Sequence, residues 1–91
     1  MVEYTIIFSK LADKDKKLIK QAGLEEKIRN LLNLISENPY ITQPTYEKLK
    51  GNLDGLFSRR ISLQHCLVYK VYENTKEIFI VRMWSHYDKV K

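Results

Sequence analysis

The chain has 91 residues, of which 44% are hydrophobic and 30% are charged. This size and balance are typical of a soluble fold with one modest core, so we expect a single domain over residues 1–91 and exclude a fibrous or disordered chain. Sixteen Lys and Arg against eleven Asp and Glu give a formal charge of +5, which favours polyanions or an acidic protein as partners.

No apolar run approaches the roughly 20 residues that a membrane span needs, and the opening MVEYTIIFSK is interrupted too soon for a signal peptide. We therefore expect a cytoplasmic protein with no membrane partner. The single cysteine, Cys66, has no second cysteine for a disulfide, which fits a reducing compartment. It also excludes a cysteine-based metal cage, and we expect neither a metal nor another cofactor.

Residues 2–8, VEYTIIF, are rich in β-branched and aromatic side chains and predict a strand. Ser9 is then a suitable N-cap for a helix over 10–22, which Gly23 would end. The lysines of this helix should lie on a solvated face. Its apolar stripe is expected to consist of Leu11, Leu18 and Ala22.

A second helix is predicted over 24–38, where apolar residues recur at helical spacing and acidic residues occupy the first turn. Asn38 and Pro39 would end it. With a tight turn at Gly23, the two helices should form an antiparallel hairpin that faces a sheet. The apolar face comprises Leu24, Ile28, Leu31, Leu32 and Ile35.

Residues 39–55 contain both prolines and two glycines without a sustained period, so they predict a long loop with a short strand or turn inside it. Strands follow over 56–62, 66–72 and 77–84, the last two joined by the hairpin turn ENTK. The expected fold is α+β and RelE-like. It has an N-terminal strand, two helices on one face of the sheet and a three-stranded antiparallel meander.

Alternation along 56–62 places Arg59 and Arg60 on opposite sides of the strand, with Arg60 on a polar strip. A solvated sheet face is the simplest interpretation of one arginine by itself. Adjacent antiparallel strands are able to bring Arg60 and Arg82 onto one surface of the sheet, in a register that the sequence does not fix. Further polar candidates around this surface are Glu47, Lys48, Lys50, His65, His86 and Tyr87.

These residue types suit a metal-independent ribonuclease that uses the 2′-hydroxyl of the RNA as its nucleophile. Such cleavage needs a base for that hydroxyl, cations for the phosphorane-like transition state and an acid for the leaving oxygen. Glutamate, arginine or lysine, and histidine supply these roles in turn. Tyr87 or Trp84 has a ring that can stack an unpaired base.

The run YEKLKGNLDGLFSRRISLQHCLVYKV, together with His86 and Tyr87, closely resembles the YoeB-type branch of the RelE/ParE toxin superfamily. The resemblance is dense over residues 46–87 and rests on several separated elements at compatible spacing. It implies a toxin of a bacterial type II toxin–antitoxin pair that cleaves mRNA in the A site of the 70S ribosome. A cognate antitoxin is then a partner, whereas homodimer formation is left undecided.

Carried over residue by residue, the resemblance implies that Glu47 is the general base, Arg60 contacts the transferring phosphate and His86 is the general acid. Tyr87 would help to place the substrate. Further contacts to the substrate are expected from Lys50, Arg59, His65 and Arg82.

Cys66 departs from the resemblance, because the family pattern has an arginine after the histidine of this strand. A thiol cannot replace a guanidinium, and the loss of one preorganised donor costs about 2.7–4 kcal/mol of transition-state stabilisation. A catalytically silent module that binds an antitoxin or the ribosome is therefore the alternative to a nuclease. A related toxin acting on gyrase is a third reading, although it leaves the Glu–Arg–His set unexplained.

Simpler interpretations exist for each residue taken singly. His86 and Glu47 are types that usually lie on the surface. Trp84 and Cys66 are types that usually pack inside, and we keep that interpretation for both. The tail after Tyr87, DKVK, brings Asp88 close to the expected site.

Overall fold

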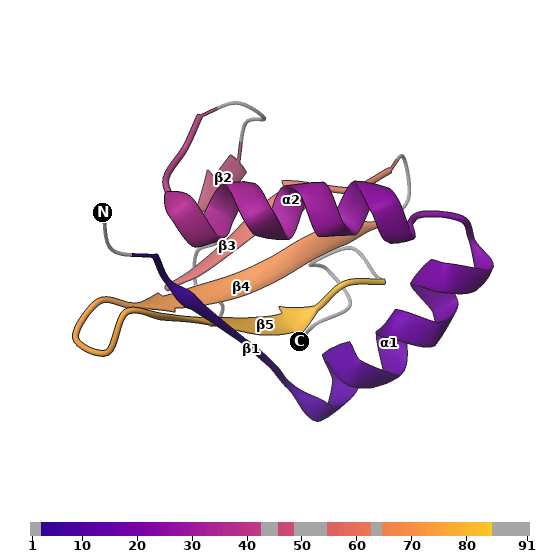
Figure 1. Ribbon diagram of the computed structural model, residues 1–91, viewed down its shortest axis with the longest axis horizontal. Coiled ribbons are helices and arrows are strands. Elements are labelled where there is room, and N and C mark those ends of the chain that lie inside the picture. The colour runs from indigo at the N-terminus through magenta and orange to yellow at the C-terminus, as the bar shows by residue number, and fades with distance from the viewer. Residues whose placement is uncertain (1–2, 43–45, 49–54, 63–64, 85–91) are drawn as a thin grey trace.

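The computed structural model describes residues 3–42, 46–48, 55–62 and 65–84. Within these ranges the chain forms two helices and one sheet of five strands (Figure 1). The elements in chain order are β1 (Thr5–Phe8), α1 (Lys10–Gln21), α2 (Glu25–Glu37), β2 (Tyr46–Lys48), β3 (Leu56–Arg60), β4 (Cys66–Tyr72) and β5 (Glu77–Arg82).

The sheet has the strand order β1-β5-β4-β3-β2. Strands β3, β4 and β5 form the predicted antiparallel meander. Strand β1 joins one edge parallel to β5, and β2 joins the other edge antiparallel to β3. The predicted α+β fold is confirmed, and β2 is the short strand expected inside the long loop.

Helix α1 begins and ends at the predicted signals. The backbone N–H of Ala12 donates to Ser9 Oγ at 3.0 Å, while that hydroxyl donates to the carbonyl of Val81 at 2.8 Å. The cap therefore also ties the start of the helix to β5. Beyond the helix, Gly23 has φ +74°, a conformation that glycine adopts without strain.

The predicted apolar stripe of α1 is wrong. Leu11 is 50% exposed and Leu18 is 36% exposed. The face that packs inward carries Ala12, Asp15 and Ile19, which are spaced by three and four residues. An aspartate in the middle of this face hid the pattern, because periodicity arguments count apolar residues.

The predicted stripe of α2 is confirmed. Its central residues Ile28, Leu31 and Ile35 are buried, and they share one core cluster with Ile78 and Ile80 of β5. In Figure 1, α2 runs above β3 and β4, while α1 lies beyond the end of β1. Both helices bury side chains in this cluster, so they cover the same face of the sheet. Neither helix of the described ranges has the length and hydropathy that crossing a membrane requires.

Candidate active site

The two faces of β3 have different surroundings, and the strand register assigns its side chains to them. Directly paired residues of neighbouring strands point to the same side of a sheet. Ser58 pairs with Glu47 of β2, and Arg60 pairs with Cys66 of β4. We call the side turned away from both helices the distal face, and these four residues share it.

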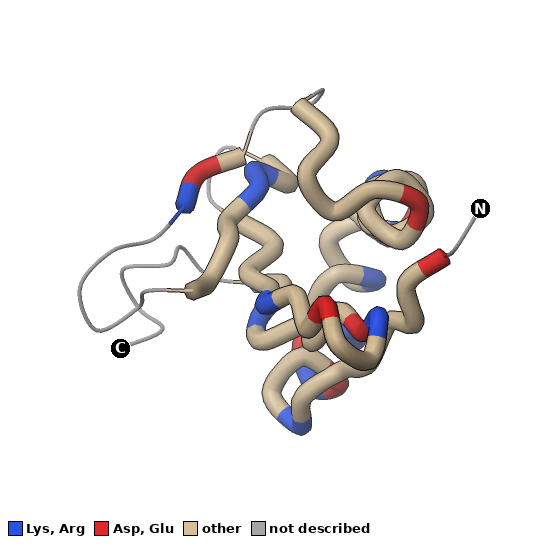
Figure 2. The backbone as a smooth tube through the Cα atoms, turned by 90° about the vertical axis from the view of Figure 1, so that its left-hand side faces the viewer, with Lys and Arg blue, Asp and Glu red and all other residues tan. Residues whose placement is uncertain are grey.

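Glu47 and Arg60 lie next to each other on the distal face. Glu47 is directly opposite Ser58, and Arg60 is two residues further along β3. Diagonal neighbours of this kind have Cα atoms about 7–8 Å apart, which long side chains bridge. Both residues are exposed. In Figure 2 the acidic and basic residues of β2 lie beside the basic end of β3.

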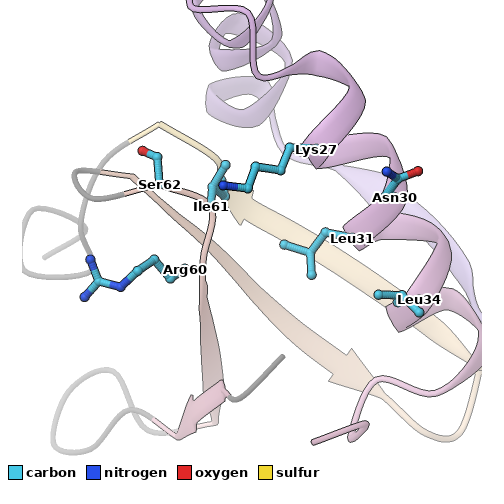
Figure 3. A pocket seen from close by; sticks show the side chains of 7 residues that line it. All are labelled: Lys27, Asn30, Leu31, Leu34, Arg60, Ile61 and Ser62. Carbon is cyan, nitrogen blue, oxygen red and sulfur yellow. The ribbon is translucent and has the colours of Figure 1, made fainter. Parts of the chain in front are cut away.

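A cavity of about 440 Å³ opens between α2 and the end of β3. Figure 3 shows Lys27, Leu31 and Ile61 around this space, while the Arg60 side chain points away from α2. Arg60 is nevertheless one of the residues that line this cavity, so it lies at the boundary between the cavity and the distal face. Among the described residues, no group of three or more His, Cys, Asp or Glu side chains is arranged to hold a metal ion.

Cys66 is buried, with 5% of its surface exposed, as expected for a small packing residue. It lies directly opposite Arg60 in the strand register. The position at which the family pattern carries an arginine is therefore adjacent to the proposed phosphate-binding residue.

Arg59 lies on the opposite side of the strand from Arg60 and is only 1% exposed. Its Nε donates to the Tyr69 hydroxyl at 2.8 Å, and its Nη2 donates to the carbonyls of Pro39 at 3.0 Å and Ile41 at 2.6 Å. Burial raises the pKa of Tyr69, whose hydroxyl also donates to the Pro39 carbonyl at 2.9 Å.

This arrangement ties the chain that follows α2 to the sheet. Arg59 also lies over the ring of Tyr46, 4.7 Å from its centroid, so it supports the strand that carries Glu47. A guanidinium held in this way has no surface to offer a substrate. We therefore leave Arg59 out of the proposed binding set and assign it a structural role.

Arg82 does not share a surface with Arg60, so that expectation is wrong. Its guanidinium lies on the helix-covered side and donates two bonds to Asp15, at 2.9 Å and 3.2 Å. Along β5, Arg82 alternates with Ile80, whose side chain is buried in the core under the helices. The register between β4 and β5 also shifts at Val68 and Tyr69. Asp15 is a residue that sequence reasoning missed, because an aspartate breaks the apolar pattern of the face that it shares with Ala12 and Ile19.

His65 lies at the start of β4 and packs against Trp84. The two rings are stacked with centroids 3.9 Å apart and planes 19° from parallel. The His65 carbonyl accepts the backbone N–H groups of Ile61 at 2.8 Å and Ser62 at 3.1 Å. Trp84 also packs against the core, so its predicted packing role is confirmed.

Three of the predicted site residues, Lys50, His86 and Tyr87, lie outside the described residues. Those the structure brings together are Glu47 and Arg60, with Cys66, the first residue of β4, paired with Arg60. Lys48 is exposed at the end of β2.

A separate polar cluster occupies the other end of β4. The hydroxyls of Tyr4 and Tyr40 donate to the carboxylate of Glu73, and Lys76 Nζ lies 3.0 Å from it. Hydrogen bonds from Tyr40, Lys76 and Tyr4 lower the pKa of Glu73 to about 2. These contacts join the residue before β1, the chain after α2 and the β4–β5 turn, so we interpret the cluster as structural.

Comparison with known proteins agrees with this geometry. The family profile described as "YoeB-like toxin of bacterial type II toxin-antitoxin system" matches residues 7–87. The curated relative "Toxin YoeB" of Synechocystis sp. is 35% identical over 75 residues, covering 82% of this chain and 78% of that protein.

Two solved structures from Staphylococcus aureus have the same fold. One is a heterotetrameric YoeB-YefM toxin-antitoxin complex, 39% identical with a TM-score of 0.77, covering 92% of this chain and 98% of that chain. The other is a YoeB dimer, 38% identical with a TM-score of 0.79, covering 93% of this chain and 99% of that chain. The chain therefore belongs to the YoeB-like toxins of bacterial type II toxin–antitoxin systems.

Proposed function

We propose that this toxin is a ribosome-dependent endoribonuclease that cleaves mRNA in the A site without a metal and so inhibits translation. The observation that carries the proposal is the pairing of Glu47 and Arg60 as diagonal neighbours on the distal face. A carboxylate and a guanidinium at this spacing are able to act on one ribose-phosphate linkage. The substrate is mRNA on the 70S ribosome, which places the protein in the cytoplasm.

In the proposed reaction Glu47 takes the proton from the 2′-hydroxyl, and that oxygen attacks the adjacent phosphorus. Arg60 stabilises the negative charge that develops on the phosphorane oxygens, and Lys50 faces the same group. His86 donates a proton to the departing 5′-oxygen, while Tyr87 places the substrate. The products are a 2′,3′-cyclic phosphate and a free 5′-hydroxyl, so atoms and charge balance without a cofactor.

Two kinds of protein partner complete the proposal. A relative is solved in complex with an antitoxin, and a chain with a charge of +5 favours an acidic partner. We propose that a cognate antitoxin inserts a segment against the basic surface and blocks the site. A relative is also solved as a dimer, and we propose that the free toxin self-associates in the same manner.

The experiment is cleavage of a defined mRNA on purified translating ribosomes, followed by mapping of the RNA ends. We expect cleavage in the A site, a 2′,3′-cyclic phosphate on the upstream fragment and complete loss of cleavage when the scissile nucleotide is 2′-deoxy. His86→Ala should lower the rate about 10²–10⁴-fold, the usual contribution of a general acid. Glu26→Gln, an exposed carboxylate of α2, serves as the control. Undiminished cleavage by His86→Ala removes the proposed acid.

A second candidate function is a weakened or silent toxin-like module that still binds the antitoxin or the ribosome. The observation in its favour is that Cys66 is paired directly with Arg60, where the family pattern carries an arginine. The two candidates differ in how much transition-state stabilisation is lost because Cys66 stands in place of an arginine. The nuclease remains the stronger proposal, because Glu47 and Arg60 still lie side by side.

A further inference from the structure

Helix α1 holds the end of β5 through one buried carboxylate. Asp15 is 2% exposed, and its Oδ2 accepts the Arg82 Nε at 2.9 Å and the backbone N–H of Met83 at 3.0 Å. Its Oδ1 accepts the Arg82 Nη2 at 3.2 Å. Three donors from two consecutive residues therefore converge on a single carboxylate. Met83 is itself only 1% exposed, while the Arg82 side chain is 21% exposed.

The residue after Met83, Trp84, is held by His65. Trp84 stacks on His65, with ring centroids 3.9 Å apart, and the His65 Nδ1 contacts the Trp84 carbonyl oxygen. His65 is fixed in turn, because its own carbonyl accepts the N–H groups of Ile61 and Ser62. Residues 82–84 are thus held by Asp15 of α1 and by His65, which precedes β4. We call these two contacts the tail clamp.

The tail clamp lies immediately before the residues proposed to do chemistry. His86 is two residues beyond Trp84, and two residues of chain span at most about 7 Å. His65 is also the chain neighbour of Cys66, which is paired directly with Arg60. Anchoring Trp84 on His65 therefore holds Trp84 next to the chain neighbour of Cys66. Restricting a catalytic group to a small volume next to its target raises its effective concentration.

We propose that Asp15 and His65 are positioning residues for the proposed general acid, acting through residues 82–84 and without touching the RNA. Arg82 is part of the tail clamp and is removed from the proposed substrate-binding residues. This inference rests on the proposed nuclease function. It predicts that a loosened tail clamp lowers kcat, whereas the affinity for programmed ribosomes, which depends on the remaining surface, changes little.

The test compares Asp15→Asn with Asp13→Asn in the same cleavage assay. Asn cannot balance the charge of Arg82, and its amide group directs hydrogen atoms at a guanidinium that only donates. Asp13 provides the matched control, because it lies on the same helix with its side chain 60% exposed and pairs with Lys16 at 3.0 Å. We expect kcat to fall at least tenfold for Asp15→Asn with KM within twofold of wild type, and no change for Asp13→Asn.

Trp84 supplies a second readout, because it is the only tryptophan of the chain. Its fluorescence should shift to longer wavelength and become more accessible to acrylamide in Asp15→Asn. All assays are run at a temperature where far-UV circular dichroism shows the variant to be folded. If it does not fold, His65→Ala opens the other half of the tail clamp and should show the same fall in kcat. His65→Phe keeps a ring for Trp84 to stack on and should recover part of that fall.

The outcomes separate this inference from the proposed function. A wild-type protein that leaves mRNA intact refutes the nuclease, while Trp84 accessibility in Asp15→Asn still supports or overturns the tail clamp as a structural device. A wild-type protein that cleaves, together with a folded Asp15→Asn of unchanged kcat, overturns the positioning role. A rise in KM at constant kcat also overturns it, because that result would place these residues in substrate binding.

Discussion

Adjacent residues of β3 show what a sequence decides about a single side chain. Alternation placed Arg59 and Arg60 on opposite sides of the strand and Arg60 on the polar side, which the structure confirms. It did not show that Pro39 and Ile41, from a distant segment, would accept hydrogen bonds from Arg59. A buried arginine that donates to backbone carbonyls requires long-range contacts, so local pattern alone assigned Arg59 to the substrate.

A prediction at the same scale concerns position 66. Cys66→Arg places a guanidinium directly opposite Arg60, so we expect the cleavage rate to rise at least tenfold and at most about 10³-fold, the range for one preorganised donor. Like charges paired across strands should lower the melting temperature slightly. Cys66→Ala is the control and should behave as wild type. An arginine variant that is folded but cleaves no faster would show that other cations already suffice, and the weakened-module candidate would then be rejected.

At the scale of elements, the described site depends on β2, a strand of three residues. The sequence predicted only a short strand or turn in this loop, because three residues are too few for a periodic signal. Strand β2 forms by pairing with the edge of β3, and Arg59 supports it by lying over the ring of Tyr46. The position of Glu47 is therefore a consequence of sheet assembly, which the local sequence does not encode.

The polar cluster around Glu73 gives a prediction for the stability of elements against pH. Hydrogen bonds hold the pKa of this carboxyl at about 2, below its ordinary value of 4.5. A lowered pKa in the folded state stabilises the fold above the ordinary pKa, and this stabilisation is lost as the pH falls toward the lowered value. Glu73→Gln should therefore be less stable than wild type at pH 6, and the difference should shrink between about pH 5 and pH 2.

Urea unfolding at a series of pH values measures this difference. Glu26→Gln, in the first turn of α2, controls for the removal of one negative charge from an exposed position. A constant gap between Glu73→Gln and wild type from pH 6 to pH 2 would contradict the assigned cluster.

At the scale of the whole molecule, hydrophobic periodicity and turn residues predicted the order of the elements. They did not predict how the strands pair. The parallel pairing of β1 with β5 and the bulge near Arg82 arise only when the sheet is complete. Arg82 bonds Asp15 of α1 and so lies away from Arg60. The sequence therefore did not reveal that Arg82 lies apart from Arg60, while the chemistry assigned to Glu47 and Arg60 stays a prediction.

The central proposal is that Glu47 and Arg60 act on the same ribose-phosphate linkage. Single-turnover cleavage by Glu47→Gln tests it most directly, because glutamine keeps the size of the side chain and removes the base. We predict a rate about 10²–10⁴-fold below wild type, with ribosome binding unchanged. Cleavage by Glu47→Gln at the wild-type rate, with the same RNA ends, would contradict the account.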